Sequence, residues 1–219
     1  MEVVGDPGAR EIVKSAIARA RTYGLENRGP VRFFLELTCT FGSGFDSDPQ
    51  LPWASNTLTD RSIQTDMLRA ERLHERMMVY LDHVAGPEQQ HAIDALKKFL
   101  EFKYEIAPRE GWSERAVLMV MAHLYPQKYE FIGEKVASTL TKRAAAEAAQ
   151  YSLPPGKGAA VLAGMMFAMG HQICEDPLYP WVAGALKDPR ITDSEGRQSR
   201  LIARLRTYGA HVLAYFSKS

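Results

Sequence analysis

Two short acidic loops carry the side chains whose types and spacing are best suited to chemistry. Asp46 and Asp48 lie in the first loop, and Glu175 and Asp176 lie in the second. Paired carboxylates can act as general acid and base or can hold a divalent cation. An aspartate followed by proline is also typical of a helix start, where it accepts hydrogen bonds from free backbone N–H groups. We favour helix capping and keep the binding or catalytic site as the alternative.

His171 follows an apolar segment directly and lies close in sequence to the second acidic loop. We expect it to bond to nearby carboxylates, with a role in a site as the alternative. The six histidines form no H-x-x-x-H, H-E-x-x-H or E-x-x-H pair with a matching partner, so we predict no metal site and no cofactor. Cys174 has no evident base and no G-x-S-x-G occurs, so we assign no catalytic residue.

Arginines recur at helical spacing after each loop. They are Arg69, Arg72 and Arg76 in the first stretch and Arg197, Arg200 and Arg204 in the second. Residues three and seven apart share one helix face, so each set forms a basic stripe. One interpretation is an anion-binding site in each of the two stretches, with Arg72 and Arg200 as the binding residues. We favour the other reading, in which the arginines pair with the acidic loops and lock each loop to its helix.

The elements that position these residues belong to an internal repeat with an offset of 128 residues. Between residues 10 and 85 and their partners, 21 of the 76 aligned positions are identical without a gap. Chance would produce about five identities at ordinary residue frequencies. The loop motif contributes five matched pairs: Gly42 and Gly170, Asp48 and Asp176, Pro49 and Pro177, Pro52 and Pro180, and Trp53 and Trp181. Such self-similarity predicts that the same supersecondary unit occurs twice.

Hydrophobic periodicity and propensity predict four helices in each unit and no strand. The second helix, over 31–42 and 159–170, is apolar nearly all round, so we expect both copies to be buried. Gly42 and Gly170 suit its left-handed end, and Pro49 and Pro177 suit the first position of the next helix, with the tryptophan packed inside. The predicted fold is an all-α, pseudo-two-fold protein. Its parts are a first unit (1–85), a helical insertion (86–133) and a second unit (134–219).

Composition excludes several classes of protein. The 219 residues are 46% hydrophobic and 24% charged, with a net charge of +1, which argues against nucleic-acid binding by bulk charge. No apolar stretch is long enough to span a bilayer, and the first residues do not form a signal peptide. Cys39 and Cys174 lack disulfide-type spacing, so we expect free thiols and a cytoplasmic protein.

The loop motif resembles that of a group of uncharacterised helical proteins encoded in bacterial type VI secretion loci. The matching features are a glycine that ends an apolar helix, an acidic residue, Asp-Pro-x-x-Pro-Trp and an arginine-rich helix, over 42–53 and 170–181. The resemblance brings no catalytic residues. It implies an accessory role, either as an immunity protein that neutralises a secreted effector or as an adaptor that loads one.

Three functions follow as hypotheses. We favour a non-enzymatic protein-binding module whose partner is a secreted effector or toxin. The first alternative is an effector or toxin enzyme, with a site made by the acidic loop residues and His171 between the two lobes. The second alternative is a structural or dimerisation domain of a larger polypeptide.

Overall fold

A computed structural model describes residues 5–104, 108 and 111–216, and these residues form helices without any strand. The all-α prediction is therefore confirmed for the described part of the chain. The first helices are α1 (Asp6–Thr22), α2 (Arg28–Phe41), η1 (Phe45–Ser47), α3 (Pro52–Thr59) and α4 (Asp66–Val84). The middle of the chain forms η2 (Pro87–Gln89), α5 (Gln90–Glu101), α6 (Glu114–Leu124) and α7 (Pro126–Gln150). The last helices are α8 (Lys157–Met169), α9 (Pro180–Leu186) and α10 (Ser194–Phe216).

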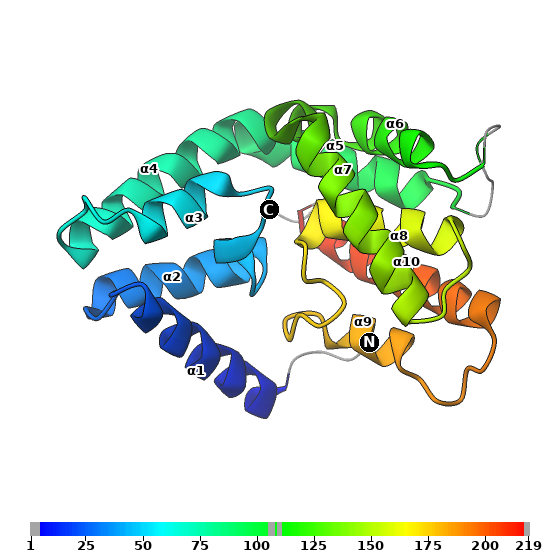
Figure 1. Ribbon diagram of the computed structural model, residues 1–219, viewed down its shortest axis with the longest axis horizontal. Helices are drawn as coiled ribbons and strands as arrows, with labels where there is room; N and C mark the ends of the chain where they lie inside the picture. Colours follow the sequence, from blue (N-terminus) through cyan, green and yellow to red (C-terminus); the bar gives the residue numbers. More distant parts are fainter. Residues whose placement is uncertain (1–4, 105–107, 109–110, 217–219) are drawn as a thin grey trace.

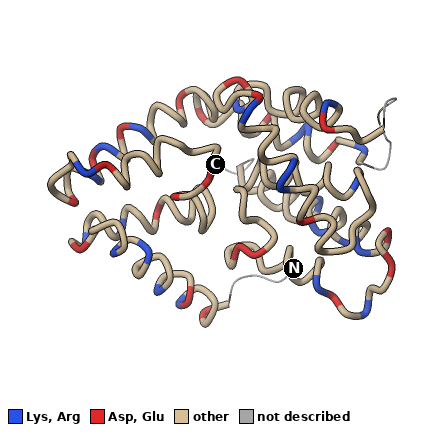
Figure 2. Tube along the Cα trace, in the orientation of Figure 1, with Lys and Arg blue, Asp and Glu red and all other residues tan. Residues whose placement is uncertain are grey.

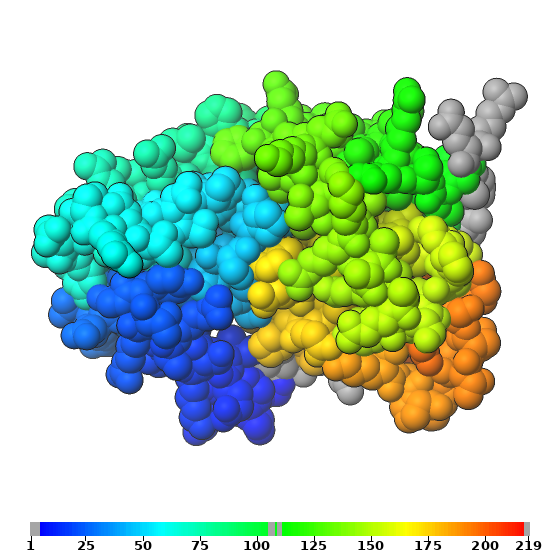
Figure 3. Space-filling view, in the orientation of Figure 1, coloured from blue at the N-terminus to red at the C-terminus, as the bar shows by residue number. Residues whose placement is uncertain are grey.

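The helices gather into two halves that meet in the centre of the molecule (Figure 1). In the first half, α1 packs on α2, and α4 packs on both α2 and α3. In the second half, α7 packs on α8 and α9 packs on α10. Helices α5 and α6 cover the second half, because α5 contacts α10 and α6 contacts α7 and α8. Figure 3 shows the blue and cyan atoms of the first half against the yellow and orange atoms of the second.

Each half has its own hydrophobic core. Phe34, Leu37 and Leu73 lie in the core of the first half, and none of them is more than 1% exposed. The second core is larger because residues from α5 and α6 join those of α7 to α10. Tyr125 packs against both cores and donates a hydrogen bond to the carbonyl oxygen of Val84 at 2.9 Å, so it ties the halves together.

Side-chain caps stabilise the starts of two helices, and a third helix bends at a glycine. The Thr65 hydroxyl accepts a hydrogen bond from the N–H of Leu68 at the start of α4, and Ser113 does the same for Ala116 in α6. Such caps satisfy N–H groups that have no partner within the helix. Helix α7 bends at Gly133, where φ is +77°. No helix among the described residues has the length and apolar composition needed to cross a membrane.

The prediction that both copies of the apolar helix are buried is correct for α8 and wrong for α2. Residues 160–167 of α8 are all buried. Helix α2 buries Phe34 and Leu37 but exposes Arg32 and Glu36, which form a salt bridge of 2.9 Å. The reason is tertiary, because α6 contacts α8 whereas the corresponding face of α2 lies at the surface.

The predicted start of the short helix is also wrong by three residues. Pro52 and Pro180, and not Pro49 and Pro177, occupy the first positions of α3 and α9. The Asp-Pro corners therefore remain outside the helices, and their aspartates do not cap them. The tryptophans differ, since Trp181 is only 3% exposed and Trp53 is half-buried, so the prediction of an inside ring is correct for the second alone.

Candidate functional site

The two acidic loops meet in the centre of the molecule, where Asp48 reaches into the opposite loop. Its Oδ2 accepts a hydrogen bond of 2.9 Å from the backbone N–H of His171, 123 residues further along the chain. Its Oδ1 accepts a bond of 2.9 Å from the N–H of Gln50 within its own loop. Burial opposes ionisation of this carboxyl group, but the bonds from His171 and Gln50 prevail and lower the pKa of Asp48.

Asp176 makes the same connections in the opposite direction. Its Oδ2 accepts a hydrogen bond of 2.8 Å from the N–H of Ser43 in the first loop. Its Oδ1 accepts one of 2.9 Å from the N–H of Leu178 in its own loop. Both aspartates are buried, at 2% and 4% exposure for Asp48 and Asp176. We call these two reciprocal connections the aspartate lock.

Gly42 and Gly170 make the aspartate lock possible. Both have a positive φ, +99° and +109°, in a region that side chains other than glycine rarely adopt. A Cβ on Gly42 would lie 3.1 Å from Oδ2 of Asp176 and 3.2 Å from the carbonyl oxygen of Met169. A Cβ on Gly170 would lie 3.0 Å from the carbonyl oxygen of Phe41. The ends of α2 and α8 therefore approach each other more closely than any other residue type would allow.

The other two acidic residues face away from the aspartate lock and bind side chains within their own halves. Asp46 accepts hydrogen bonds from Arg19 and from Tyr23, the latter at 2.7 Å. Glu175 accepts from Tyr151 and forms a salt bridge of 2.8 Å with Lys187. The four predicted carboxylates are thus divided between a central pair and two outer contacts, and they do not form one cluster.

His171 lies in the aspartate lock itself. It is 4% exposed, and its Nδ1 lies 3.3 Å from Oδ2 of Asp48. The hydrogen bond to the carboxylate comes from the backbone N–H of His171, and the ring lies beside the carboxylate without a hydrogen bond of its own from Nδ1. Among the described residues, no group of three or more histidine, cysteine, aspartate and glutamate side chains is arranged to hold a metal ion.

The arginine stripe does not pair with the acidic loops, so that prediction is wrong. Arg69 donates through Nη1 to three backbone carbonyls between Thr57 and Asp60, and through Nη2 to that of Ile63. Arg197 donates in the same way to the carbonyl oxygen of Ile191. A guanidinium with several donors suits a turn that leaves carbonyls without partners.

The two tentative binding arginines also lie away from the acidic loops. Arg72 forms an exposed salt bridge of 2.9 Å with Glu75. Arg200 lies 3.6 Å from Asp188, which also binds Arg190. Neither arginine contacts the aspartate lock, so the predicted site residues are split among the lock, the two outer carboxylate contacts and these two separate arginine contacts.

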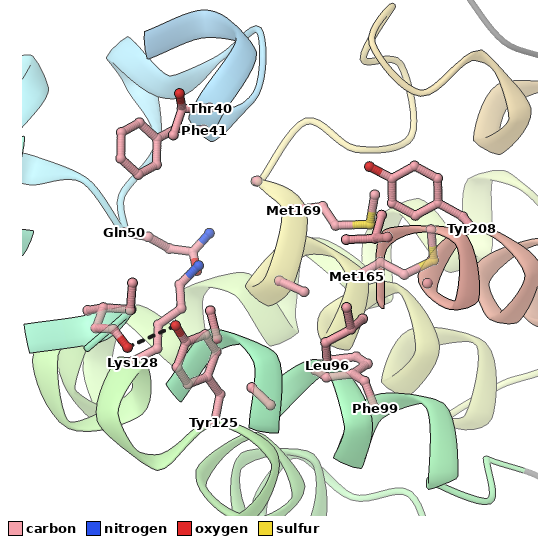
Figure 4. A pocket seen from close by; sticks show the side chains of 18 of the residues that line it. Thr40, Phe41, Gln50, Leu96, Phe99, Tyr125, Lys128, Met165, Met169 and Tyr208 are labelled. Carbon is pink, nitrogen blue, oxygen red and sulfur yellow. Dashed lines mark hydrogen bonds between the residues drawn. The ribbon is translucent and has the colours of Figure 1, made fainter. Parts of the chain in front are cut away.

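Beside the aspartate lock lies a pocket of about 340 Å³ that the sequence does not indicate (Figure 4). Helices α2, α4, α5, α7, α8 and α10 contribute to its wall, together with the first acidic loop. Lys128 on α7 lines it and is only 7% exposed, and its Nζ lies 5.4 Å from the centre of the Phe167 ring. Burial lowers the pKa of Lys128 to about 8, against the opposing effect of Asp48. A lysine between Pro126 and Tyr129 shows no pattern that predicts burial.

The outer face of α4 presents a second candidate site, made of exposed apolar side chains. Met67 and Val79 are 51% and 50% exposed, and Leu68 and Met78 are 40% and 42% exposed. We call these four residues the α4 face. Met67 and Met78 are about three helical turns apart, as are Leu68 and Val79, so the four lie along one side of the helix. Charged residues of both signs lie between them (Figure 2).

A shallow groove of about 410 Å³ opens beside Met67, between α2 and α4. Phe33 forms its apolar wall, and its ring lies 5.8 Å from that of His74. Glu71 and Glu75 lie on the groove as well. An apolar floor with carboxylates beside it can accept an apolar side chain that has a basic neighbour.

The two cysteines are free, as predicted, with Cys39 exposed and Cys174 buried. Burial and then the neighbouring Glu147 raise the pKa of Cys174, so its thiol stays protonated and unreactive. Comparisons of the chain with protein-family models, with curated proteins and with solved structures found no match.

Proposed function

We propose that the chain is a duplicated helical unit that serves as a non-enzymatic protein-binding module. The helix bounds support the duplication. Adding 128 to the bounds of α1 gives 134–150, the part of α7 that follows the bend at Gly133. The same shift carries α2 to within one residue of α8, α3 to within one residue of α9, and the start of α4 onto the start of α10. The aspartate lock relates the two units by the same exchange in both directions.

The single observation that carries the binding function is the α4 face. Four of the eight large hydrophobic side chains that are exposed in the described chain lie on this one helix. Scattered apolar residues are normal on a protein surface, but two exposed apolar pairs on the same side of one helix offer two anchor points for a partner. Methionine suits such a surface because its flexible, polarisable side chain adapts to different shapes.

The residues beside the α4 face support a partner of a particular chemical kind. The groove next to Met67 combines the apolar wall of Phe33 with the carboxylates of Glu71 and Glu75. We propose that it receives an amphipathic segment of a protein, with an apolar side chain against Phe33 and an adjacent lysine or arginine facing the glutamates. In line with the motif resemblance, we propose a secreted effector of a type VI system as this partner, which the chain neutralises or loads.

The enzyme alternative has less support from the geometry. A general base must reach its substrate with a free oxygen. Both oxygens of Asp48 and of Asp176 accept backbone hydrogen bonds in the aspartate lock. Asp46 binds Arg19 through Oδ2, and its Oδ1 has no partner among the described residues but is buried, while Glu175 binds Lys187. We therefore treat the acidic loops as structural and not as a catalytic pair.

The test is co-purification with each effector encoded beside the chain's own gene, using the double variant Met67→Glu with Met78→Glu. Two charges on the α4 face should abolish capture of the effector, because an apolar partner surface would have to desolvate them. Met119→Glu is the matched control, since Met119 is 65% exposed but lies on α6. Circular dichroism should show unchanged helix content in both variants.

The proposal requires that the wild type and Met119→Glu retain the same effector while the double variant loses it. Equal retention by all three proteins would place the contact elsewhere and refute the α4 face. Failure of every neighbouring effector to bind the wild type would refute the immunity and adaptor roles.

A further inference from the structure

The pocket beside the aspartate lock is mostly apolar at one end, where Tyr208 lies near Met169, and polar at the other end (Figure 4). Leu96, Phe99, Met165 and Met169 line the apolar end, where α5 and α8 face each other. Gln50 and Lys128 turn their side chains toward each other at the opposite end. A cavity of about 340 Å³ falls within the range of small-molecule sites, which are mostly apolar with a few placed polar groups.

Three charged residues line this pocket within the described chain, namely Asp48, Lys128 and Arg206. The carboxylate of Asp48 already accepts hydrogen bonds from His171 and Gln50. No side-chain hydrogen bond or ion pair joins Lys128 to another described residue, and its Nζ lies over the face of the Phe167 ring, 5.4 Å from the ring centre. Lys128 is therefore a buried cation that lacks a counter-ion at hydrogen-bond distance.

Gln50 is the second incompletely bonded group at the polar end. Its Nε2 donates to Asp48 and to the carbonyl oxygen of Met166, which fixes the amide in place. Its Oε1 is buried and accepts no hydrogen bond from a described residue. Buried polar groups are nearly always bonded. The amide oxygen of Gln50 needs a donor and faces the ammonium group of Lys128, while the ammonium group itself lacks an anionic acceptor among the described residues.

We propose that this pocket binds an amphipathic carboxylate, such as a medium-chain fatty acid. The carboxylate lies against the ammonium group of Lys128, and the hydrocarbon chain runs along Leu96, Phe99, Met165 and Met169. The charge-assisted hydrogen bond replaces the hydration that Lys128 loses on folding. The chain excludes water from the apolar end, which supplies the remaining affinity. This site is separate from the α4 face, so either proposal can fail without the other.

The test is calorimetric titration of the intact chain with decanoate and with decanol, which share a hydrocarbon chain and differ in the head group. Decanoate should bind more tightly than decanol. Lys128→Met keeps the length and the apolar stem of the side chain but removes the charge. It should weaken decanoate binding at least about tenfold, as expected for the loss of a charge-assisted bond, and leave decanol binding unchanged.

Two further variants test whether a change in affinity comes from this pocket and from this lysine. Lys135→Met removes an exposed lysine from the same helix and should leave both affinities unchanged. Ala168→Trp places a large ring at an exposed position on the pocket wall and should weaken both ligands. The proposal is overturned if decanoate binds Lys128→Met as tightly as the wild type, if decanol binds as tightly as decanoate, or if decanoate does not bind at about 1 mM.

Discussion

Helices α2 and α8 end in the same way but differ in what covers them. Each helix ends at a glycine with a positive φ, and the loop that follows contains an aspartate that accepts a hydrogen bond from the other loop. Yet α8 is buried over 160–167, whereas α2 carries exposed Arg32 and Glu36. At the positions 128 residues later, the chain has Ala160 and Gly164.

Packing of the segment 86–133 against the second half explains why α8 is buried and α2 is exposed. A Cβ on Gly164 would lie 3.3 Å from the Phe99 ring of α5, and one on Gly209 of α10 would lie 2.7 Å from Leu100. The corresponding first-half residues are Glu36, which is exposed, and Leu81, which is half-buried. The two loops share one geometry because each loop holds the other, whereas the surfaces of the two helices differ because their neighbours differ.

The largest expected effect comes from giving α8 the residue of α2. Gly164→Glu would bury a carboxylate against Phe99, and we expect a loss of more than about 4 kcal/mol in the free energy of unfolding. Glu36→Gly, the opposite exchange in α2, should cost only about 1 kcal/mol, through helix propensity. Urea unfolding followed by circular dichroism measures both. Similar losses for the two variants would contradict the role assigned to α5.

Breaking the aspartate lock should have the next largest effect. Asp48→Ala would leave the N–H groups of His171 and Gln50 without acceptors, at a cost of about 3 kcal/mol. Asp176→Ala should cost about 2 kcal/mol, because Asp176 accepts from fewer groups. The double variant should lose less than the sum of the two, since both aspartates hold the same junction. Strict additivity in urea unfolding would show that the two connections are independent.

The lock also predicts a pH dependence. Because the folded state lowers the pKa of Asp48, its ionised form contributes stability above the ordinary aspartate value near 4, and this contribution is lost as the pH falls through the lower folded value. The difference in unfolding free energy between wild type and Asp48→Ala should therefore be full at pH 7 and should shrink below about pH 4. A difference that stays the same as the pH falls well below about 4 would refute the assignment.

Gly42→Ala sharpens the comparison of the two helix ends. We expect a loss of about 2 kcal/mol, from the positive φ together with the contacts of a Cβ with Asp176 and Met169. Gly24→Ala is the control, because Gly24 has a φ of +73° but an open environment, and it should cost about 1 kcal/mol. Thermal unfolding distinguishes the two. Equal losses would mean that backbone conformation alone, and not close approach, requires Gly42.

The smallest expected effect on the unfolding free energy comes from replacing an exposed arginine of the stripe, and a second arginine of the same stripe serves as the comparison. Arg72→Met should change the unfolding free energy by less than about 0.5 kcal/mol, as is usual for an exposed salt bridge. Arg69→Met should cost about 1.5 kcal/mol, because the carbonyls after α3 lose a shared donor. Equal effects in chemical unfolding would show that Arg69 does not hold this turn.

The local features of the chain were predictable from its residues. Helix formers and hydrophobic spacing predict helices throughout, and the described chain contains no strand. Gly42 and Gly170 stand at helix ends with positive φ, as predicted, although their ψ values of 158° and 148° are extended and not those of the left-handed helical conformation. These features depend on backbone preferences and on neighbours a few residues away, which a single sequence contains.

Tertiary packing decided the contacts between residues that are far apart in the sequence. The acceptors for the N–H groups of Ser43 and His171 lie 133 and 123 residues away, so no local pattern identified them. The burial of α8, the exposure of α2 and the burial of Lys128 follow from where α5 to α7 pack. Sequence periodicity shows which side of a helix is apolar, but only the packed structure determines which partner covers that side and which polar groups remain without one.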